Sequence, residues 1–309
     1  MTDEKKQFDI AIVGAGPAGL SASVYASRYG LKNVIIGGIA GGAASQTHEI
    51  GNWLGTKNVA GFQFAQDAME HAKSLEAQME TALVDEITEE NGMFTLFLSN
   101  GKKIEARSII LAMGTKHRHL GVPGEKEFSG KGVSYCATCD GFFYRGKTVA
   151  VVGGNDSAAG AAVYLADIAE KVYVIYRGEK LRCESFWMNA IEKNPKVKVL
   201  YNTNIKEIKG AEKLEEVELD SPHEGSETLK IDGVFVEIGA DPNVDLAKDL
   251  EIEVDADGYI VVQPDGKTSR KGVWAAGDIT TGSNKFKQIV TAAAEGAIAA
   301  QSIQKYLAK

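Results

Sequence analysis

The chain of 309 residues contains only three cysteines, Cys136, Cys139 and Cys183. So small and odd a number argues against a fold that is held together by disulfides. The net charge is −8 and the sequence has no run of lysines or arginines, so the basic surface that nucleic-acid binding requires is missing. The first apolar run, Ile10–Val13, is far too short for a signal sequence or a membrane span. We therefore expect a cytoplasmic protein that binds neither membranes nor nucleic acids.

Glycine, by contrast, is abundant, with 34 of 309 residues. Residues 8–14 and 147–153 are each a short apolar run that ends in a glycine turn. Each is followed by a helical segment, about 17–29 and 157–169, and then by a further apolar run, 33–36 and 171–176. These are βαβ patterns, which predict parallel sheets with both faces covered. The expected fold class is α/β, with two Rossmann-like, three-layer dinucleotide-binding domains.

The second of these domains is predicted to be inserted in the first. Residues 117–124 and 239–243 are turn-rich and indicate two linkers, whereas 259–262 and 272–276 are predicted strands and 287–306 is a predicted alanine-rich helix. We expect residues 1–116 and 246–309 to form one discontinuous domain and residues 118–243 to form the other.

The first glycine turn consists of Gly14, Gly16, Pro17, Ala18 and Gly19, with one alanine between the first two glycines. Such a turn needs glycine to bend tightly, to let the backbone approach a pyrophosphate and to let the helix pack on the strand. The N-terminus of the following helix offers N–H groups and a positive dipole end to phosphates. No acidic residue ends the second strand at 35–38, so the adenosine ribose must be held in another way.

A second group of candidate residues lies near the C-terminus. Gly277 and Asp278 end a predicted strand, and Lys287, Gln288 and Ile289 begin the last helix. Asp278 either caps a helix or accepts a hydrogen bond from a ribityl hydroxyl. A flavin at the N-terminus of the last helix would have its reduced, negatively charged edge stabilised by the helix dipole.

The second glycine turn has an asparagine, Asn155, where a third glycine is expected after Gly153 and Gly154. Asparagine tolerates left-handed backbone angles, but its side chain hinders the approach of a phosphate. After the next strand, Arg177 and Arg182 (with a lysine between them) either bind a ribose 2′-phosphate or form a solvated loop.

Cys136 and Cys139 are separated by two residues and are followed by Asp140. Two thiols at this spacing close a small disulfide ring and hold thiolate character at neutral pH. A neighbouring carboxyl can donate a proton to a departing sulfur. Zinc would need two more ligands, and neither a second Cys-x-x-Cys nor paired histidines at finger spacing occur, so no metal is expected. Cys183 is expected to be a packing residue.

The segment 136–145, Cys-Ala-Thr-Cys-Asp-Gly-Phe-Phe-Tyr-Arg, resembles the active-site sequence of the low-molecular-weight thioredoxin reductases. The segments 14–19, 52–53, 112–115, 239–243 and 272–278 resemble other motifs of that family. The resemblance covers nearly the whole chain. It implies a homodimer with FAD in the discontinuous domain and a pyridine nucleotide, NADPH, in the inserted domain.

The resemblance also implies roles for the dithiol. Cys139 would face the flavin, Cys136 would attack the partner disulfide, and Asp140 would be the general acid. The implied partner is thioredoxin or a thioredoxin- or glutaredoxin-like protein. The positions that match the family's FAD site are Gly14, Gly16, Pro17, Ala18, Gly19, Gly42, Asn52, Ala112, Gly114, Gly277, Asp278, Lys287, Gln288 and Ile289. Those that match its NAD(P)H site are Gly153, Gly154, Asn155, Asp156, Ser157, Arg177 and Arg182.

The nucleotide part departs from the family pattern. Asn155 replaces a glycine, residues 176–178 read Tyr-Arg-Gly in place of His-Arg-Arg, and residues 160–161 read Gly-Ala in place of an acidic pair. Ala43 stands where a flavin-site glutamine is usual. The leading hypothesis is a thioredoxin-disulfide reductase that uses NADPH. The alternatives are the same chemistry with NADH, a ferredoxin or a deazaflavin as donor, a flavin dithiol oxidase that uses oxygen, and a non-catalytic flavoprotein.

Overall fold

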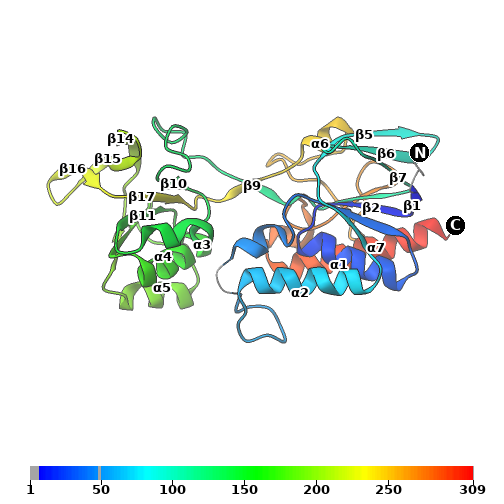
Figure 1. Cartoon of the computed structure of the whole chain (residues 1–309), viewed down its shortest axis with the longest axis horizontal. Helices are drawn as coiled ribbons and strands as arrows, with labels where there is room; N and C mark the ends of the chain where they lie inside the picture. Colours follow the sequence, from blue (N-terminus) through cyan, green and yellow to red (C-terminus); the bar gives the residue numbers. More distant parts are fainter. Residues whose placement is uncertain (1–6, 48–49, 309) are drawn as a thin grey trace. The chain divides into compact units, whose positions relative to one another are not determined.

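The computed structural model describes residues 7–47 and 50–308, which form two compact units (Figure 1). Unit 1 comprises Met1–Lys116 and Pro242–Lys309, and unit 2 comprises His117–Asp241. Residues 1–6 and 309, which the sequence assigns to the discontinuous domain, lie outside the described residues. The chain crosses between the units through strands β9 (Thr115–His117) and β18 (Ala240–Pro242), which pair with each other. Unit 2 is therefore inserted between two segments of unit 1.

Unit 1 is built on a five-stranded sheet in which all strand pairs are parallel. Its central strands are short apolar runs that are buried throughout, which is the pattern of a parallel sheet covered on both faces. In spatial order the strands are β19 (Val273–Ala275), β8 (Ile109–Leu111), β2 (Ile10–Val13), β3 (Asn33–Ile36) and β4 (Gln78–Glu80).

Helices cover one face of this sheet and a second sheet covers the other (Figure 1). Ile10 and Ile12 of β2 pack in the helical layer, whereas Ala11 and Val13 pack towards the second sheet. The helices are α1 (Pro17–Arg28), α2 (Gly61–Ser74) and α7 (Ile289–Leu307). The second sheet has the order β1 (Gln7–Phe8), β7 (Lys103–Ala106), β6 (Met93–Leu98) and β5 (Val84–Glu90). Smaller elements of unit 1 are η1 (Gly42–Gln46), α6 (Asp245–Asp249) and η3 (Gly282–Lys285).

Unit 2 repeats this arrangement. A five-stranded parallel sheet separates a helical layer from a three-stranded antiparallel sheet. The parallel sheet has the order β10 (Val133–Ser134), β17 (Gly233–Val236), β11 (Thr148–Val152), β12 (Lys171–Ile175) and β13 (Val197–Leu200). The helices are α3 (Ala137–Asp140), η2 (Gly141–Tyr144), α4 (Asp156–Ile168) and α5 (Ser185–Lys193). The antiparallel sheet consists of β14 (Ile205–Gly210), β15 (Leu214–His223) and β16 (Ser226–Lys230). The predicted α/β fold with two three-layer units is confirmed.

Two predicted elements are corrected. The expected strand at 259–262 is not a strand, because Ile260 alone bridges to Val254 on one side and to Thr280 on the other. The last helix begins at Ile289 and not at Lys287, because Gln288 has extended backbone and caps the helix. Within the described ranges, no helix is long and apolar enough to cross a membrane.

Candidate active site

The first glycine turn joins β2 to α1 and is tightly packed. Gly14 has φ +121°, and a Cβ on it would lie 2.1 Å from the carbonyl oxygen of Ala112. A Cβ on Gly19 would lie 1.9 Å from the carbonyl oxygen of Gly14. Only glycine fits at these two positions, since any side chain would separate the helix from the sheet.

The other side of the same turn is open. A Cβ on Gly16 would meet nothing closer than the Cα of Gly42, at 4.0 Å. Pro17 opens α1, and no side chain caps the first turn of this helix, so its backbone N–H groups are left to an outside acceptor. This bare helix N-terminus beside two facing glycines fits the pyrophosphate of a dinucleotide.

Several other expected flavin-site residues lie around the carboxyl edge of the same sheet. Ala112 and Gly114 directly follow β8, and Gly114 has φ +62° with open space where a Cβ would be. The Asn52 amide donates to Gln288 Oε1 at 2.9 Å. Gln288 also forms a capping box with Thr291 at the start of α7. The structure thus brings the loop at residue 52 to the N-terminus of α7.

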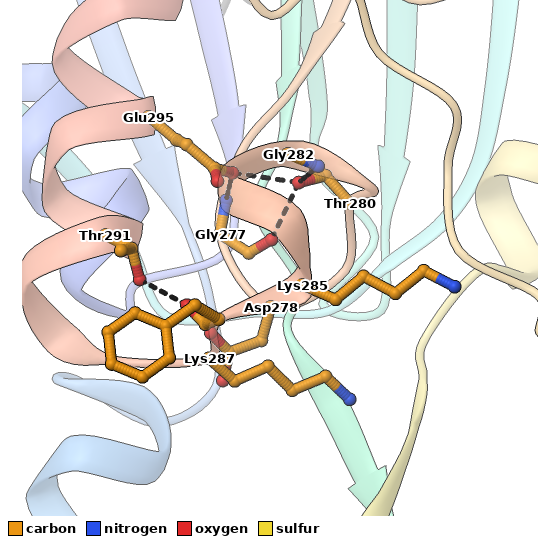
Figure 2. A pocket seen from close by; sticks show the side chains of 9 residues that line it. Gly277, Asp278, Thr280, Gly282, Lys285, Lys287, Thr291 and Glu295 are labelled. Carbon is orange, nitrogen blue, oxygen red and sulfur yellow. Dashed lines mark hydrogen bonds between the residues drawn. The ribbon is translucent and has the colours of Figure 1, made fainter.

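A small pocket lies between the turn at Gly277 and the start of α7 (Figure 2). Glu295 accepts hydrogen bonds from the Gly277 N–H and from the Thr280 hydroxyl, both at 2.8 Å. Asp278 lines the pocket, and its pKa is raised by burial, while Lys287 acts in the opposite direction. Asp278 is not the N-cap of η3 or of α7, because those N-caps are Thr281 and Gln288.

The turn that precedes α7 is strained. Ser283, Asn284 and Lys285 have φ values of 47°, 55° and 57°, a left-handed conformation that costs each non-glycine residue about 1–2 kcal/mol. The Lys285 ammonium holds the turn in place through ion pairs with Asp255 at 2.7 Å and Asp257 at 2.6 Å. Gly282, Ser283 and Asn284 are residue types typical of turns, and they are the signal that could have found this one.

The second glycine turn, in unit 2, differs from the first at its open side. Asn155 has φ −95°, so it does not use the left-handed conformation that the sequence suggested. Its Oδ1 instead accepts the Ala158 N–H at 3.0 Å and caps α4. The ring of Tyr176 covers Gly154, since a Cβ there would lie 2.5 Å from ring carbons. The Asn155 side chain therefore stands where the first turn has the open Gly16.

The loop after β12 carries exposed cations. Arg177, Lys180 and Arg182 are all exposed, and no ion pair of theirs is found in the part of the chain that the structure describes. The Arg182 N–H donates to the Gly154 carbonyl at 2.6 Å, which ties this loop to the glycine turn. Asp156 Oδ1 accepts the Glu184 N–H at 2.6 Å, while Ser157 is exposed on the first turn of α4.

Gly160 stands where the family has the first of two acidic residues. A Cβ on Gly160 would lie 3.5 Å from the Trp187 ring of α5. Trp187 therefore takes the space into which an acidic side chain would extend. The glycine at position 160, where the family has an acidic residue, therefore packs against Trp187, and the sequence did not reveal this contact.

The two cysteines of the dithiol form a disulfide, with Cα atoms 5.3 Å apart. The Cys139 N–H donates to Cys136 Sγ at 3.1 Å, a contact that favours negative charge on Cys136 in the reduced state. Cys139 is exposed and Cys136 is partly buried. Asp140 ends α3 directly after Cys139, so the structure brings all three predicted catalytic residues together.

Two carboxyl groups of unit 2, Glu125 and Glu237, were missed from the sequence. Glu125 is 5% exposed and accepts hydrogen bonds from the N–H groups of Leu120 and Gly121, each at 2.7 Å, and from the Tyr135 hydroxyl at 2.9 Å. Glu125 thereby ties the linker at Leu120 and Gly121 to Tyr135, the residue that precedes Cys136.

Glu237 directly follows β17, and burial raises its pKa to about 7. A carboxyl directly after a buried strand was the signal that could have found it.

Cys183 is a free thiol that packs partly buried against the helical core of unit 2, and burial raises its pKa. No group of three or more potential metal ligands occurs among residues 7–47 and 50–308.

The site and the fold together define a disulfide oxidoreductase with two dinucleotide-binding units. A family model described as "Pyridine nucleotide-disulphide oxidoreductase" matches residues 8–296. The thioredoxin reductase of Bacillus subtilis is 40% identical over 307 residues, 98% of this chain and 96% of that protein. The solved thioredoxin reductase of T. acidophilum has a TM-score of 0.92 at 36% identity and covers 99% of this chain and 100% of its own. That of Lactococcus lactis has a TM-score of 0.92 at 32% identity, with 97% and 99% covered.

The chain therefore belongs to the pyridine nucleotide-disulphide oxidoreductase family and, within it, to the low-molecular-weight thioredoxin reductases. The family is flavin-dependent.

Proposed function

We propose that this enzyme reduces the disulfide of thioredoxin, or of a thioredoxin- or glutaredoxin-like protein, through FAD and the Cys136–Cys139 dithiol. The observation that carries the proposal is the disulfide itself, formed by two cysteines three residues apart and followed at once by a carboxyl, Asp140. Its support is the similarity to proteins that are named thioredoxin reductase over nearly their full length.

FAD is the proposed cofactor of unit 1, where it would supply two-electron chemistry. The phosphates would lie at Gly14, Gly16, Pro17, Ala18 and Gly19, with Gly42 facing the turn. The remaining positions of the proposed site are Asn52, Ala112, Gly114, Gly277, Asp278, Lys287, Gln288 and Ile289. The open side of Gly16 and the uncapped start of α1 support the phosphate part. Asp278, which keeps a proton more readily than an ordinary carboxyl, would bind a ribityl hydroxyl.

The dithiol residues have distinct proposed roles. In the reduced protein, the Cys136 sulfur attacks one sulfur of the partner disulfide and forms a mixed disulfide. Cys139 then attacks Cys136, so that the internal disulfide forms again and the partner leaves with two thiols. The Cys139 N–H, 3.1 Å from Cys136 Sγ, lowers the cost of negative charge on the attacking sulfur. Asp140 is the proposed acid that supplies protons to departing thiolates.

NADPH is the proposed electron donor, held in unit 2 by Gly153, Gly154, Asp156 and Ser157 with Arg177 and Arg182 at a 2′-phosphate. The exposed arginines support it. A second candidate keeps the dithiol chemistry but takes electrons from NADH, a ferredoxin or a deazaflavin. Two observations favour this second candidate: Asn155 already uses the Ala158 N–H, and the Tyr176 ring covers Gly154.

Anaerobic stopped-flow measurement of flavin bleaching, with NADPH and NADH in separate runs, tests the donor. Fast bleaching by NADPH supports the proposal. A preference for NADH would mean that the loop at Arg177 no longer selects a phosphate. Absence of bleaching by both, with normal reduction by dithionite, would overturn the nucleotide part and leave the dithiol part intact. A homodimer and a cytoplasmic location stay predictions.

A further inference from the structure

Tyr135 lies where the chain leaves the parallel sheet of unit 2 and enters the dithiol segment. Strand β10 pairs with β17 at Val133 and Ser134. Tyr135 is the next residue, and the chain bends there before Cys136, the N-cap of α3. The position of the Cys136 sulfur therefore depends on what holds this bend.

The side chain of Tyr135 is held from two directions. Its hydroxyl donates to Glu125 Oε1 at 2.9 Å, and His119 Nδ1 lies 2.8 Å from the same hydroxyl oxygen. The His119 ring also packs edge-on against the Tyr135 ring, with centroids 5.0 Å apart. Glu125 is buried and is fixed in turn by the N–H groups of Leu120 and Gly121. The bend is thus anchored to the linker through one phenol.

The hydrogen bonds run in one direction. A tyrosine hydroxyl has a single proton, and that of Tyr135 is donated to Glu125. The Tyr135 oxygen can then only accept from His119, so the Nδ1 atom of His119 carries a hydrogen. Burial, and after it the hydrogen bond to Glu125, raise the pKa of the Tyr135 hydroxyl, so it keeps the proton that this chain of hydrogen bonds needs.

The atoms of Cys136 are held by shorter-range contacts. The Cys136 N–H donates to Ser134 Oγ at 3.1 Å, and the Ser134 hydroxyl donates to the Cys136 carbonyl at 3.3 Å. The Asp140 N–H donates to the same carbonyl at 3.2 Å, and the Cys139 N–H donates to Cys136 Sγ. These bonds join residues 134–140 to one another, whereas the Tyr135 hydroxyl ties that segment to Glu125 and the linker.

We propose that Tyr135 is a positioning residue for Cys136 and that His119 and Glu125 hold it in place. This inference rests on the proposed function, in which the Cys136–Cys139 pair alternates between disulfide and dithiol. With the bend fixed, the two sulfurs stay close to bonding distance, which raises the effective concentration of each for the other. The hydrogen bonds of Tyr135 thereby stabilise the disulfide relative to the dithiol and make the reduced pair a stronger reductant of its partner.

The thiol–disulfide equilibrium with dithiothreitol tests the inference on the flavin-loaded enzyme. Anaerobic samples are equilibrated with mixtures of reduced and oxidised dithiothreitol, trapped with N-ethylmaleimide and analysed by peptide mass spectrometry, with Cys183 as internal reference for labelling. In this exchange dithiothreitol loses two electrons and two protons, and the protein disulfide gains them. Tyr135→Phe removes the hydroxyl and keeps the ring. We expect its equilibrium constant for reduction to exceed that of wild type about fivefold, the factor that one hydrogen bond typically contributes.

Further variants complete the design. His119 is exposed, so His119→Ala should fold normally and shift the equilibrium constant in the same direction, whereas His119→Asn keeps an N–H donor and should restore most of the wild-type value. The double variant of His119→Ala with Tyr135→Phe should shift no further than Tyr135→Phe alone, because both changes act through one hydroxyl. Tyr201→Phe is the matched control. It removes a hydroxyl directly after β13, at the opposite edge of the parallel sheet from β10, and should leave the constant unchanged.

An equilibrium constant that is the same in wild type, Tyr135→Phe and His119→Ala overturns the inference, and so does an equal shift in Tyr201→Phe. A lower melting temperature with an unchanged constant overturns it too, since a merely structural hydrogen bond stabilises the fold without favouring the disulfide. Because the equilibrium needs neither donor nor partner, loss of thioredoxin reduction in Cys136→Ser tests the proposed function separately.

Discussion

The start of α4 allows a direct test of how unit 2 treats phosphates. Asn155 Oδ1 accepts the Ala158 N–H at 3.0 Å, and this N–H is one that a helix N-terminus otherwise offers to an anion. Asn155→Gly frees it. Glycine in place of an asparagine cap costs only a few tenths of a kcal/mol, whereas a hydrogen bond to a charged group contributes about 1.5–3 kcal/mol. The net gain predicts that NADPH binds on the order of tenfold more tightly to the variant.

The dissociation constant is measured from the NADPH dependence of flavin bleaching, or from quenching of intrinsic fluorescence where bleaching is absent. Asn155→Asp is the matched control, since aspartate also caps the helix but adds a negative charge, and it should weaken binding. An Asn155→Gly variant that folds normally and binds NADPH no better than wild type would refute the reasoning. The Tyr176 ring over Gly154 would then be the obstacle.

Three further predictions concern other residues. Cys139→Ser should retain the flavin but lose electron transfer to disulfides; normal turnover with a disulfide substrate would contradict its role. Glu125→Ala should destabilise unit 2 by about 3 kcal/mol in urea unfolding, because three hydrogen-bond donors lose their acceptor; a change below about 1 kcal/mol would contradict this. Glu237 has a pKa raised from 4.5 to about 7, so the native state holds this proton more tightly than the unfolded state and wild-type stability falls as pH rises through that window. Glu237→Gln in the oxidised protein should therefore gain stability over wild type, up to about 3 kcal/mol at pH 8, and a difference that does not vary with pH would contradict the prediction.

The strands and helices that carry the glycine turns could be predicted because their sequence signals are local. The buried run Ile10–Val13, its glycine turn and the helix that starts at Pro17 follow one another within a few residues. The segment at 259–262 has the same apolar character, but Ile260 bridges two separate segments and does not join a ladder. Whether an apolar run finds a partner strand depends on distant residues, which a local pattern does not contain.

The site residues also fall into those that a local sequence motif predicts and those that depend on distant parts of the chain. The dithiol is a contiguous motif, and its residues meet as predicted. The sequence suggested a left-handed backbone at Asn155, but the backbone there is extended and the side chain caps α4. The position of Tyr176 over Gly154 arises from the packing of two segments that are distant in the sequence. Nothing in the neighbouring sequence letters encodes this contact.

The paired crossings β9 and β18 make the chain modular. The Arg118 N–H donates to the Gly239 carbonyl at 3.0 Å, and the Asn243 N–H donates to the Gly114 carbonyl at 3.0 Å. The two ends of unit 2, at Arg118 and Gly239, are therefore hydrogen-bonded to each other. The two points of unit 1 between which it is inserted, Gly114 and Asn243, are joined in the same way. A short turn from Gly114 to Asn243 would close unit 1 into a continuous chain, and residues 118–239 could be transplanted as a cassette. On the proposed function, that cassette would carry both the donor site and the Cys136–Cys139 dithiol.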